Sequence, residues 1–296
     1  MVKLMAGDYM SIRTDLAVER QEMRKNESVD GVEISYEENK DCKATIIEIT
    51  GRKGAEILGK PEGRYITLEM SAFPDSSGIC DGRFEMLVKM LDSLIPENGA
   101  VLIAGLGNPD ITPDAIGPLC ASEILATRHI PKETAEELKL PSLREVAVIS
   151  TGVTGKTGIE TLEIISGIKE KIKPSCIIVI DALAARSVNR LGTTIQLSDT
   201  GIEPGSGVGN RRQAISFSSL GVPVIAIGIP TVVDAATLSY DLTGKEPEDE
   251  RYSQMIVTPK DTDIISSGGA RLISLCLNCV LQKNLTKEEI ISLTMQ

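Results

Sequence analysis

The sequence predicts an α/β protein in which a mostly parallel sheet carries helices on both faces. Short apolar runs alternate along the chain with segments of helical spacing, as is typical of parallel sheets. The apolar runs, which predict buried strands, lie at residues 100–106, 146–150, 176–180 and 222–229. Earlier β-rich segments, separated by glycine and charged residues, predict a small antiparallel element near the N-terminus.

The first part of the chain predicts an arm, a short helix and three strands. Residues 1–15 are expected to form a detachable arm, and a charged helix follows from Thr14 to about Glu27. Segments rich in β-branched and aromatic residues predict strands at 32–36, 44–49 and 65–70. We expect these strands to form a small antiparallel β layer or an edge of the sheet.

Helices are expected wherever apolar residues recur at helical spacing. They lie over residues 85–94, 114–127, 159–172 and 262–281. The second of them has a typical start, with Thr112 as N-cap, Pro113 in the first position and Asp114 in the first turn. Between Leu242 and Tyr252, a charged stretch that contains proline predicts a surface loop.

Size, composition and charge limit the possible functions. The 296 residues suit one large α/β domain or two smaller ones. A formal net charge of -11 argues against direct binding of nucleic acid or of an anionic membrane, because phosphate recognition needs a basic surface. No apolar run reaches roughly 18 residues, and the first ten residues lack the apolar core of a signal peptide. We therefore expect a cytoplasmic protein.

The six cysteines lie far apart and are expected to be reduced and mostly buried. Cys276 and Cys279 form a C-x-x-C pair inside an apolar helical pattern. No second pair and no nearby histidine completes a metal site, so we assign the pair to core packing and expect no cofactor.

Two aspartates are the candidate catalytic residues. Asp114 and Asp181 each follow an apolar strand, and both are expected just past the strand ends, on the edge of a parallel sheet where ligands bind. Taken singly, Asp114 could serve the helix dipole and Asp181 could cap a turn. Together they suggest an acid/base pair, because two close carboxylates share a proton. A Ser-His-Asp or Cys-His arrangement would have to use His129, the only histidine. Because His129 is expected at a helix end, nucleophilic catalysis is a poor alternative.

Three glycine-rich loops surround the same edge. Residues 105–108 resemble a dinucleotide fingerprint only weakly, and Ser150 stands where a phosphate loop over 152–157 would need glycine. The third loop, over 205–212, carries Arg211 and Arg212 and is expected to be either a clamp for a carboxylate or a solvated turn.

Longer motifs resemble the germination proteases of spore-forming bacteria. The matching segments lie, in order, at 12–19, 62–69, 105–108, 112–115, 157–161, 180–186, 193–201, 204–210, 221–228, 230–235 and 257–260. They cover nearly the whole chain. The segment between Tyr240 and Val257 is shorter than in other members of that family.

The resemblance implies a three-layer α/β/α fold similar to hydrogenase maturation endopeptidases. It also implies an aspartate-dependent endopeptidase that degrades small acid-soluble spore proteins in the forespore and spore core. The catalytic aspartates of the family fall on Asp114 and Asp181, and a homotetramer is expected.

The family is made as a zymogen, and the arm of this chain is similar to its substrates. Those substrates are cut after Thr-Glu and before an apolar residue, alanine, serine and glutamate, a pattern that residues 14–19 follow. The resemblance therefore predicts self-cleavage between Asp15 and Leu16, with residues 1–15 as propeptide and 16–296 as a single peptidase domain.

A cleavage motif flanked by acids calls for cationic pockets. The candidates are Arg211 and Arg212 first, then Arg186 and Lys156, with Asn108 as a further substrate-binding residue. Two alternatives stay open. One is a metal-dependent maturation endopeptidase of the same fold, and the other is a non-catalytic module that binds a nucleotide or peptide.

Overall fold

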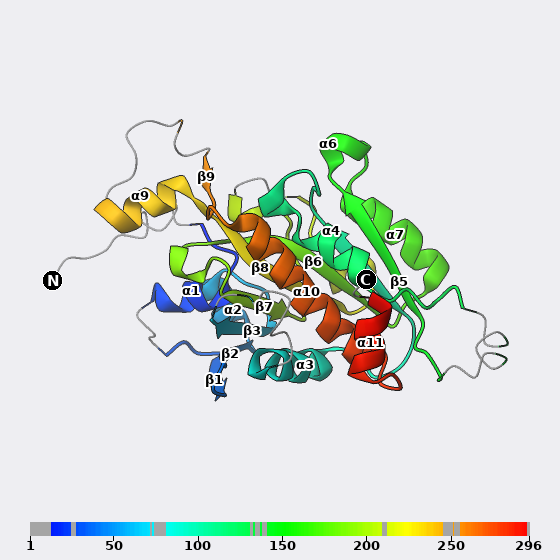
Figure 1. Cartoon of the computed structure of the whole chain (residues 1–296). Coiled ribbons are helices and arrows are strands. Elements are labelled where there is room, and N and C mark those ends of the chain that lie inside the picture. The colour runs from blue at the N-terminus through cyan, green and yellow to red at the C-terminus, as the bar shows by residue number, and fades with distance from the viewer. Residues whose placement is uncertain are drawn as a thin grey trace.

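The computed structural model describes residues 13–24, 28–71, 73, 81–130, 133, 137, 141–208, 212–244, 251 and 255–294. Their strands form one sheet in the order β1-β2-β3-β7-β8-β6-β4-β5, and β9 pairs with β8 (Figure 1). The strands are β1 (Val32–Glu38), β2 (Cys42–Ile49), β3 (Gly63–Met70), β4 (Val101–Leu106), β5 (Val146–Gly152), β6 (Cys176–Ala185), β7 (Thr194–Ser198), β8 (Val224–Asp234) and β9 (Ile256–Val257).

Helices cover both faces of this sheet, which confirms the α/β/α prediction. They are α1 (Ala17–Glu22), α2 (Arg52–Leu58), α3 (Gly82–Leu94), α4 (Ile116–Glu123), α6 (Thr154–Thr157), α7 (Thr161–Ile172), α8 (Phe217–Leu220), α9 (Ala235–Thr243), α10 (Thr262–Leu281) and α11 (Lys287–Thr294). Alternate residues of β4 point to opposite layers: Val101 and Ile103 pack with α3, α4 and α10, whereas Leu102 and Ala104 pack with α7 and α8.

The N-terminal strands are an edge of the main sheet and not a separate layer. β1, β2 and β3 pair antiparallel, and β3 joins the sheet through β7, which the sequence analysis did not predict. The parallel part consists of β5, β4, β6 and β8, as expected. β7 pairs antiparallel with β8, and β8 lies beside β6, the strand that carries Asp181.

Two predicted boundaries near the candidate site are wrong. The helix expected over 114–127 is a 3-10 turn, Thr112–Asp114, followed by α4, and Ala115 is the N-cap of α4 in place of Thr112. The strand expected to end at residue 180 continues to Ala185, because β8 remains beside β6 after β4 has ended. Asp181 therefore lies inside a strand and not beyond it.

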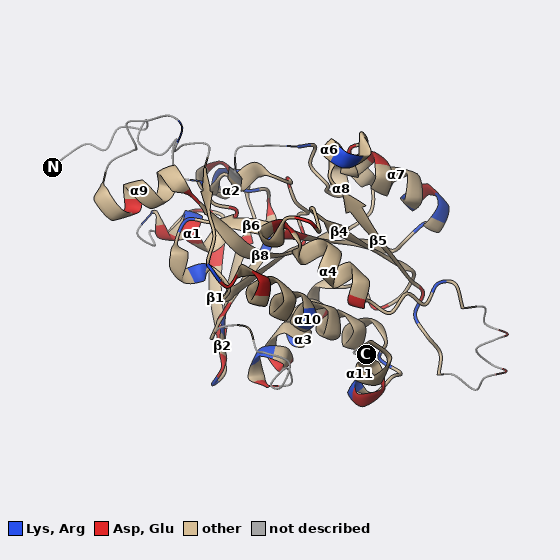
Figure 2. Ribbon diagram, turned by 45° about the horizontal axis from the view of Figure 1, so that its top comes forward, with Lys and Arg blue, Asp and Glu red and all other residues tan. Residues whose placement is uncertain are grey.

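Helix α10 has the bounds that the sequence predicted. Within the described part of the chain it is the one helix long and apolar enough for a membrane span, yet 72% of that stretch is buried against the rest of the protein. It packs on α4, α3 and β8, so burial in the core explains its composition. In Figure 2, α4 and α10 are mostly tan, and charged residues mark the outer helices such as α7 and α11.

The structure also bears on the predicted N-terminal helix, the charged loop, the cysteines and His129. The expected helix over 14–27 is α1, and residues 25–27 lie outside the described part. Most of the charged loop between Leu242 and Tyr252 also lies outside it. Of the cysteines, Cys80 is not described, Cys279 is half-buried and the other four are buried. His129 is exposed in a turn rather than at a helix end.

Candidate active site

Asp181 lies where β6 loses one of its two neighbours. β4 pairs with β6 only as far as Gly105 and Ile180, whereas β8 continues, with Gly228 opposite Asp181. The end of β4 leaves room beside the Asp181 side chain, which is nevertheless only 7% exposed. Its Oδ1 accepts the N–H of Ala182 at 2.9 Å. A carboxyl group is thus held at the carboxyl end of β4, where parallel sheets place their ligands.

A close approach between α4 and the sheet brings Asp114 to the same place. A Cβ on Gly117 of α4 would lie 2.2 Å from the carbonyl oxygen of Leu106 and 2.5 Å from that of Ile180. Only glycine allows α4 to lie directly on the ends of β4 and β6. The 3-10 turn that ends in Asp114 immediately precedes α4, so this contact fixes the position of Asp114.

The loop after β4 holds the Asp114 side chain. The backbone N–H of Asn108 donates to Asp114 Oδ2 at 2.8 Å. Gly107 has φ +109, and a Cβ there would lie 2.1 Å from the Asp114 carbonyl oxygen. The predicted glycine-rich turn therefore binds the carboxylate of Asp114.

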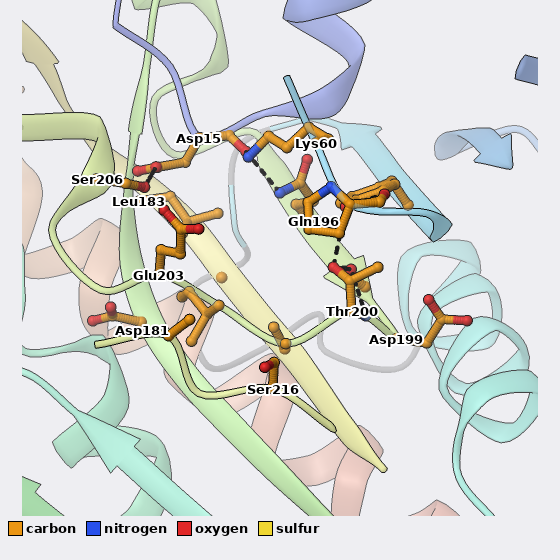
Figure 3. Close-up of a pocket in the computed structure, with 18 of the residues that line it drawn as sticks. Asp15, Lys60, Asp181, Leu183, Gln196, Asp199, Thr200, Glu203, Ser206 and Ser216 are labelled. Carbon is orange, nitrogen blue, oxygen red and sulfur yellow. Dashed lines mark hydrogen bonds between the residues drawn. The ribbon is translucent and has the colours of Figure 1, made fainter. Parts of the chain in front are cut away.

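Both aspartates line one cavity of about 270 Å³. Asp15 from the arm and Arg212 also line it. A larger cavity, of about 690 Å³, shares Asp15 and Asp181 with the first and extends along β7 and β8 (Figure 3). Asp181 therefore borders both cavities.

The environments of the two carboxyl groups differ. Burial, together with the negative charges of Asp114 and Asp15, raises the pKa of Asp181 to about 8. Burial also raises the pKa of Asp114, but the Asn108 N–H and the positive charge of Arg212 oppose that shift. The pair can therefore share one proton, and at neutral pH that proton is on Asp181.

Arg212 is the only one of the described candidate binding cations that lines this cavity, and it donates to Thr154 Oγ1 at 3.1 Å. Arg211 lies outside the described residues. The side chains of Arg186 and Lys156 instead form ion pairs with Asp241 and Asp110.

Asn108 holds Asp114 through its backbone N–H. Its side-chain oxygen accepts the N–H of Asp110 at 3.1 Å, within its own loop. Substrate binding by the Asn108 side chain stays a prediction.

Comparisons with known proteins show the family of this chain. A family model described as germination protease matches residues 12–244. The chain belongs to the germination protease family. It is 41% identical to the germination protease of Caldanaerobacter subterraneus over 95% of this chain and 97% of the relative. The match to the Bacillus subtilis germination protease is 44% identical over 83% of this chain and 72% of the relative.

Among solved structures, the chain is similar to a [NiFe] hydrogenase maturation protease, HycI, from Thermococcus kodakarensis. The TM-score is 0.37 and the identity 17%, over 64% of this chain and 98% of that one. The family membership itself makes the chain a peptidase.

The end of the arm, at Asp15, lies in the site. The carboxylate of Asp15 accepts a hydrogen bond from Ser206 Oγ at 2.7 Å and one from the N–H of Ala184 at 2.9 Å. The Asp15 N–H donates in turn to the Ala184 carbonyl at 2.9 Å. A Cβ on Gly207 would lie 2.2 Å from the Asp15 carboxylate. Asp15 is thus enclosed by β6 and the glycine-rich loop.

The residues after Asp15 are firmly anchored. Leu16 is fully buried, and Glu19 is 2% exposed. The Glu19 carboxylate accepts hydrogen bonds from Arg190, at 3.2 Å, and from the N–H groups of Arg186 and Ser187, at 2.7 and 3.0 Å. The cation that binds this glutamate is therefore Arg190, a residue that the sequence analysis did not select.

Among the described residues, no three His, Cys, Asp or Glu side chains converge in an arrangement that could hold a metal ion. This part of the chain therefore provides no ligand set for the metal-dependent alternative. The segment that resembled an incomplete phosphate loop, residues 152–157, contains the four-residue helix α6, and its Lys156 forms an ion pair with Asp110.

Proposed function

We propose that Asp114 and Asp181 hydrolyse peptide bonds as an acid/base pair. The ionised Asp114 accepts a proton from water, and the water oxygen forms a bond to the carbonyl carbon. The protonated Asp181 then gives its proton to the leaving nitrogen as the C–N bond breaks. The products are a carboxylic acid and an amine, and the proton on Asp114 returns to Asp181 before the next turnover. Burial raises the pKa of both groups, to about 8 for Asp181, and the Asn108 N–H opposes the rise for Asp114; this difference supports the division of roles.

The same site acts first on the chain itself, between Asp15 and Leu16. The observation that carries this proposal is that Asp15 lines the cavity of both catalytic aspartates. The bound carboxylates of Asp15 and Glu19 flank the bond on both sides, as in the acid-flanked motif. Residues 1–15 are then the propeptide, and residues 16–296 the active peptidase.

The physiological substrates are small acid-soluble spore proteins, cut in the cytoplasm of the germinating spore by a homotetramer. Membership of the germination protease family supports the substrate class. The net charge of -11 fits an enzyme that does not itself bind nucleic acid. Light scattering on the purified protein tests the tetramer, and a peptide with the sequence of residues 12–22 tests the motif.

Intact mass of the full-length chain tests the reaction. Incubation at mildly acidic pH is expected to yield residues 16–296 from the wild type, while Asp114→Asn and Asp181→Asn are cut more slowly by a factor on the order of 10²–10⁴. A conversion rate independent of protein concentration would identify cleavage within one chain. A wild type that stays uncut, or variants cut at the wild-type rate, would contradict the proposal.

A further inference from the structure

The carbonyl oxygen of Asp15 is bound by two side chains from outside the arm. Lys60 Nζ donates to it at 2.8 Å, and Gln196 Nε2 at 3.1 Å (Figure 3). This carbonyl belongs to the peptide bond between Asp15 and Leu16. Neither donor takes part in the acid/base chemistry described above, and neither is needed to seat the Asp15 carboxylate.

The orientation of the Gln196 amide is fixed by a second hydrogen bond. Its Oε1 accepts the N–H of Ala17 at 2.7 Å, so its Nε2 must face the Asp15 carbonyl. The side chain is 8% exposed, and its position on β7 is set by pairing with Gly228 of β8. Gln196 thus binds the chain on both sides of the bond, through groups that a substrate in any sequence context would provide.

Sheet register places this amide and the catalytic acid on one face. Gly228 pairs with Gln196 on β7 and with Asp181 on β6, so the three residues form a row across adjacent strands. Residues in one row point to the same face. The residue between them is Gly228, and the side chain of Leu183 packs over it, since a Cβ there would lie 2.4 Å from Leu183 Cγ.

Lys60 reaches the carbonyl from a rigid turn. It follows Gly59, which ends α2 in the left-handed conformation at φ +62. The Lys60 N–H donates to the Ala55 carbonyl at 3.2 Å, which ties the turn to the helix. The ammonium group is therefore presented to the carbonyl by a fixed backbone.

We infer that Lys60 and Gln196 form the oxyanion-binding site of this peptidase. When water attacks the carbonyl carbon, the electron pair of the C=O double bond moves to the oxygen. An ammonium and an amide N–H group already in contact with that oxygen stabilise the negative charge more than they stabilise the neutral carbonyl. The charge returns to reform C=O as the C–N bond breaks and the nitrogen takes its proton from Asp181. This inference rests on the proposed function.

The backbone amides of the glycine-rich loops are less suited to this role. The Asn108 N–H is occupied by Asp114, and the Lys156 and Thr157 N–H groups bond to the carbonyl of Val153. By contrast, Lys60 and Gln196 already contact the oxygen that would develop charge.

Single-turnover self-cleavage of the full-length chain tests the two donors. Lys60→Met and Gln196→Glu are expected to convert at least roughly 10²-fold more slowly than the wild type, the usual cost of one lost oxyanion donor, and Lys60→Arg is expected to recover most of the rate. Gln196→Glu keeps the acceptor for Ala17, and it replaces the donor by an oxygen that carries negative charge when ionised. Lys169→Met is the matched control, because Lys169 donates to a different backbone carbonyl, that of Leu220, at 2.9 Å.

The Gln196→Glu variant also gives a readout that a structural role would not move. Its carboxyl group becomes a donor again when protonated, so the ratio of variant to wild-type rate should rise as pH falls from 8 to 5. Amide exchange of residues 13–19 checks that the arm remains seated. Wild-type rates in both variants with a seated arm would overturn the inference alone, as would a pH-independent ratio. An uncut wild type, or a cut elsewhere than after Asp15, would overturn the proposed function and this inference with it.

Discussion

Asp114 and Asp181 line one cavity, and the negative charge of Asp114 helps to raise the pKa of Asp181. Each carboxyl group is held by a different backbone N–H, that of Asn108 or that of Ala182. The two groups come from segments separated by a complete strand–helix unit, and the sheet brings them together. Their unequal environments make the pair sensitive to pH in both stability and activity.

Replacing Asp181 by asparagine should remove a pH dependence of stability. The pKa of this carboxyl is about 8 in the folded protein against an ordinary value of 3.8, so the folded state holds its proton more tightly. The stabilisation is fully present below pH 4 and is lost as pH rises towards 8. Urea unfolding at pH 5, 6, 7 and 8 should show the wild type losing stability relative to Asp181→Asn. The exposed Asp263→Asn serves as control; a constant difference for Asp181→Asn would refute the assignment.

Replacing Arg212 by methionine should move the pH profile of cleavage. Arg212 lowers the pKa of both Asp114 and Asp181, so both values rise without it. Because Asp114 must be ionised to act as base, the acidic limb of the pH–rate profile should shift to higher pH. Arg212→Lys should retain most of the wild-type profile. Lys156→Met, which removes a cation paired with Asp110, is the control. An unmoved acidic limb would show that Arg212 does not act on the pair.

Replacing Gly117 by alanine tests the contact that positions Asp114. The added methyl group would meet the carbonyl oxygens of Leu106 and Ile180, so α4 must shift, at a cost of about 1–3 kcal/mol in the free energy of unfolding. Cleavage should slow as well. Gly167→Ala on α7 is the matched control, because a Cβ there meets nothing within 4 Å, and it should stabilise by about 0.5–1 kcal/mol. Equal effects of the two changes in denaturant unfolding would argue against the contact.

Replacing Arg190 by methionine should destabilise the segment that follows the cleavage site. Arg190 is 8% exposed and bonds to Glu19, Glu22 and Glu69, so its loss leaves the Glu19 carboxylate buried without its cation. Breaking a buried pair typically costs about 3–5 kcal/mol.

The matched control is Arg52→Met, which removes an exposed pair with Glu56 and should change stability by less than about 0.5 kcal/mol. Thermal unfolding of both variants measures the contrast. A small effect of Arg190→Met would mean that water replaces the arginine at Glu19.

The sequence allowed the parallel strands and α10 to be predicted because their apolar patterns are long and continuous. It also indicated Asp114 and Asp181, since each comes after such an apolar run in the sequence. It could not show that Asp181 lies inside β6, because the end of β4, and not the local sequence, creates the open space there.

The sequence analysis missed Gln196 and Lys60 for a different reason. Gln196 alternates with apolar neighbours on β7, as a solvent-facing side chain would, and Lys60 follows a glycine in what resembles a surface turn. Their partner is the arm, which lies 181 residues from Gln196 and 45 from Lys60 along the chain. A local sequence pattern cannot predict contacts between residues so far apart in the sequence, and the structure is needed to find them.

The burial of Leu16, Ala17 and Val18 has a consequence for the self-cleavage that we propose. These residues belong to the core, so after such a cut the segment that follows the bond would stay in place while the arm could leave. The protein would then retain part of its own product. A tethered occupant competes at an effective concentration in the millimolar range, far above that of a free substrate. Turnover of other proteins then depends on loosening of the new N-terminus, which makes the detachment of α1 a control point separate from the chemistry of cleavage.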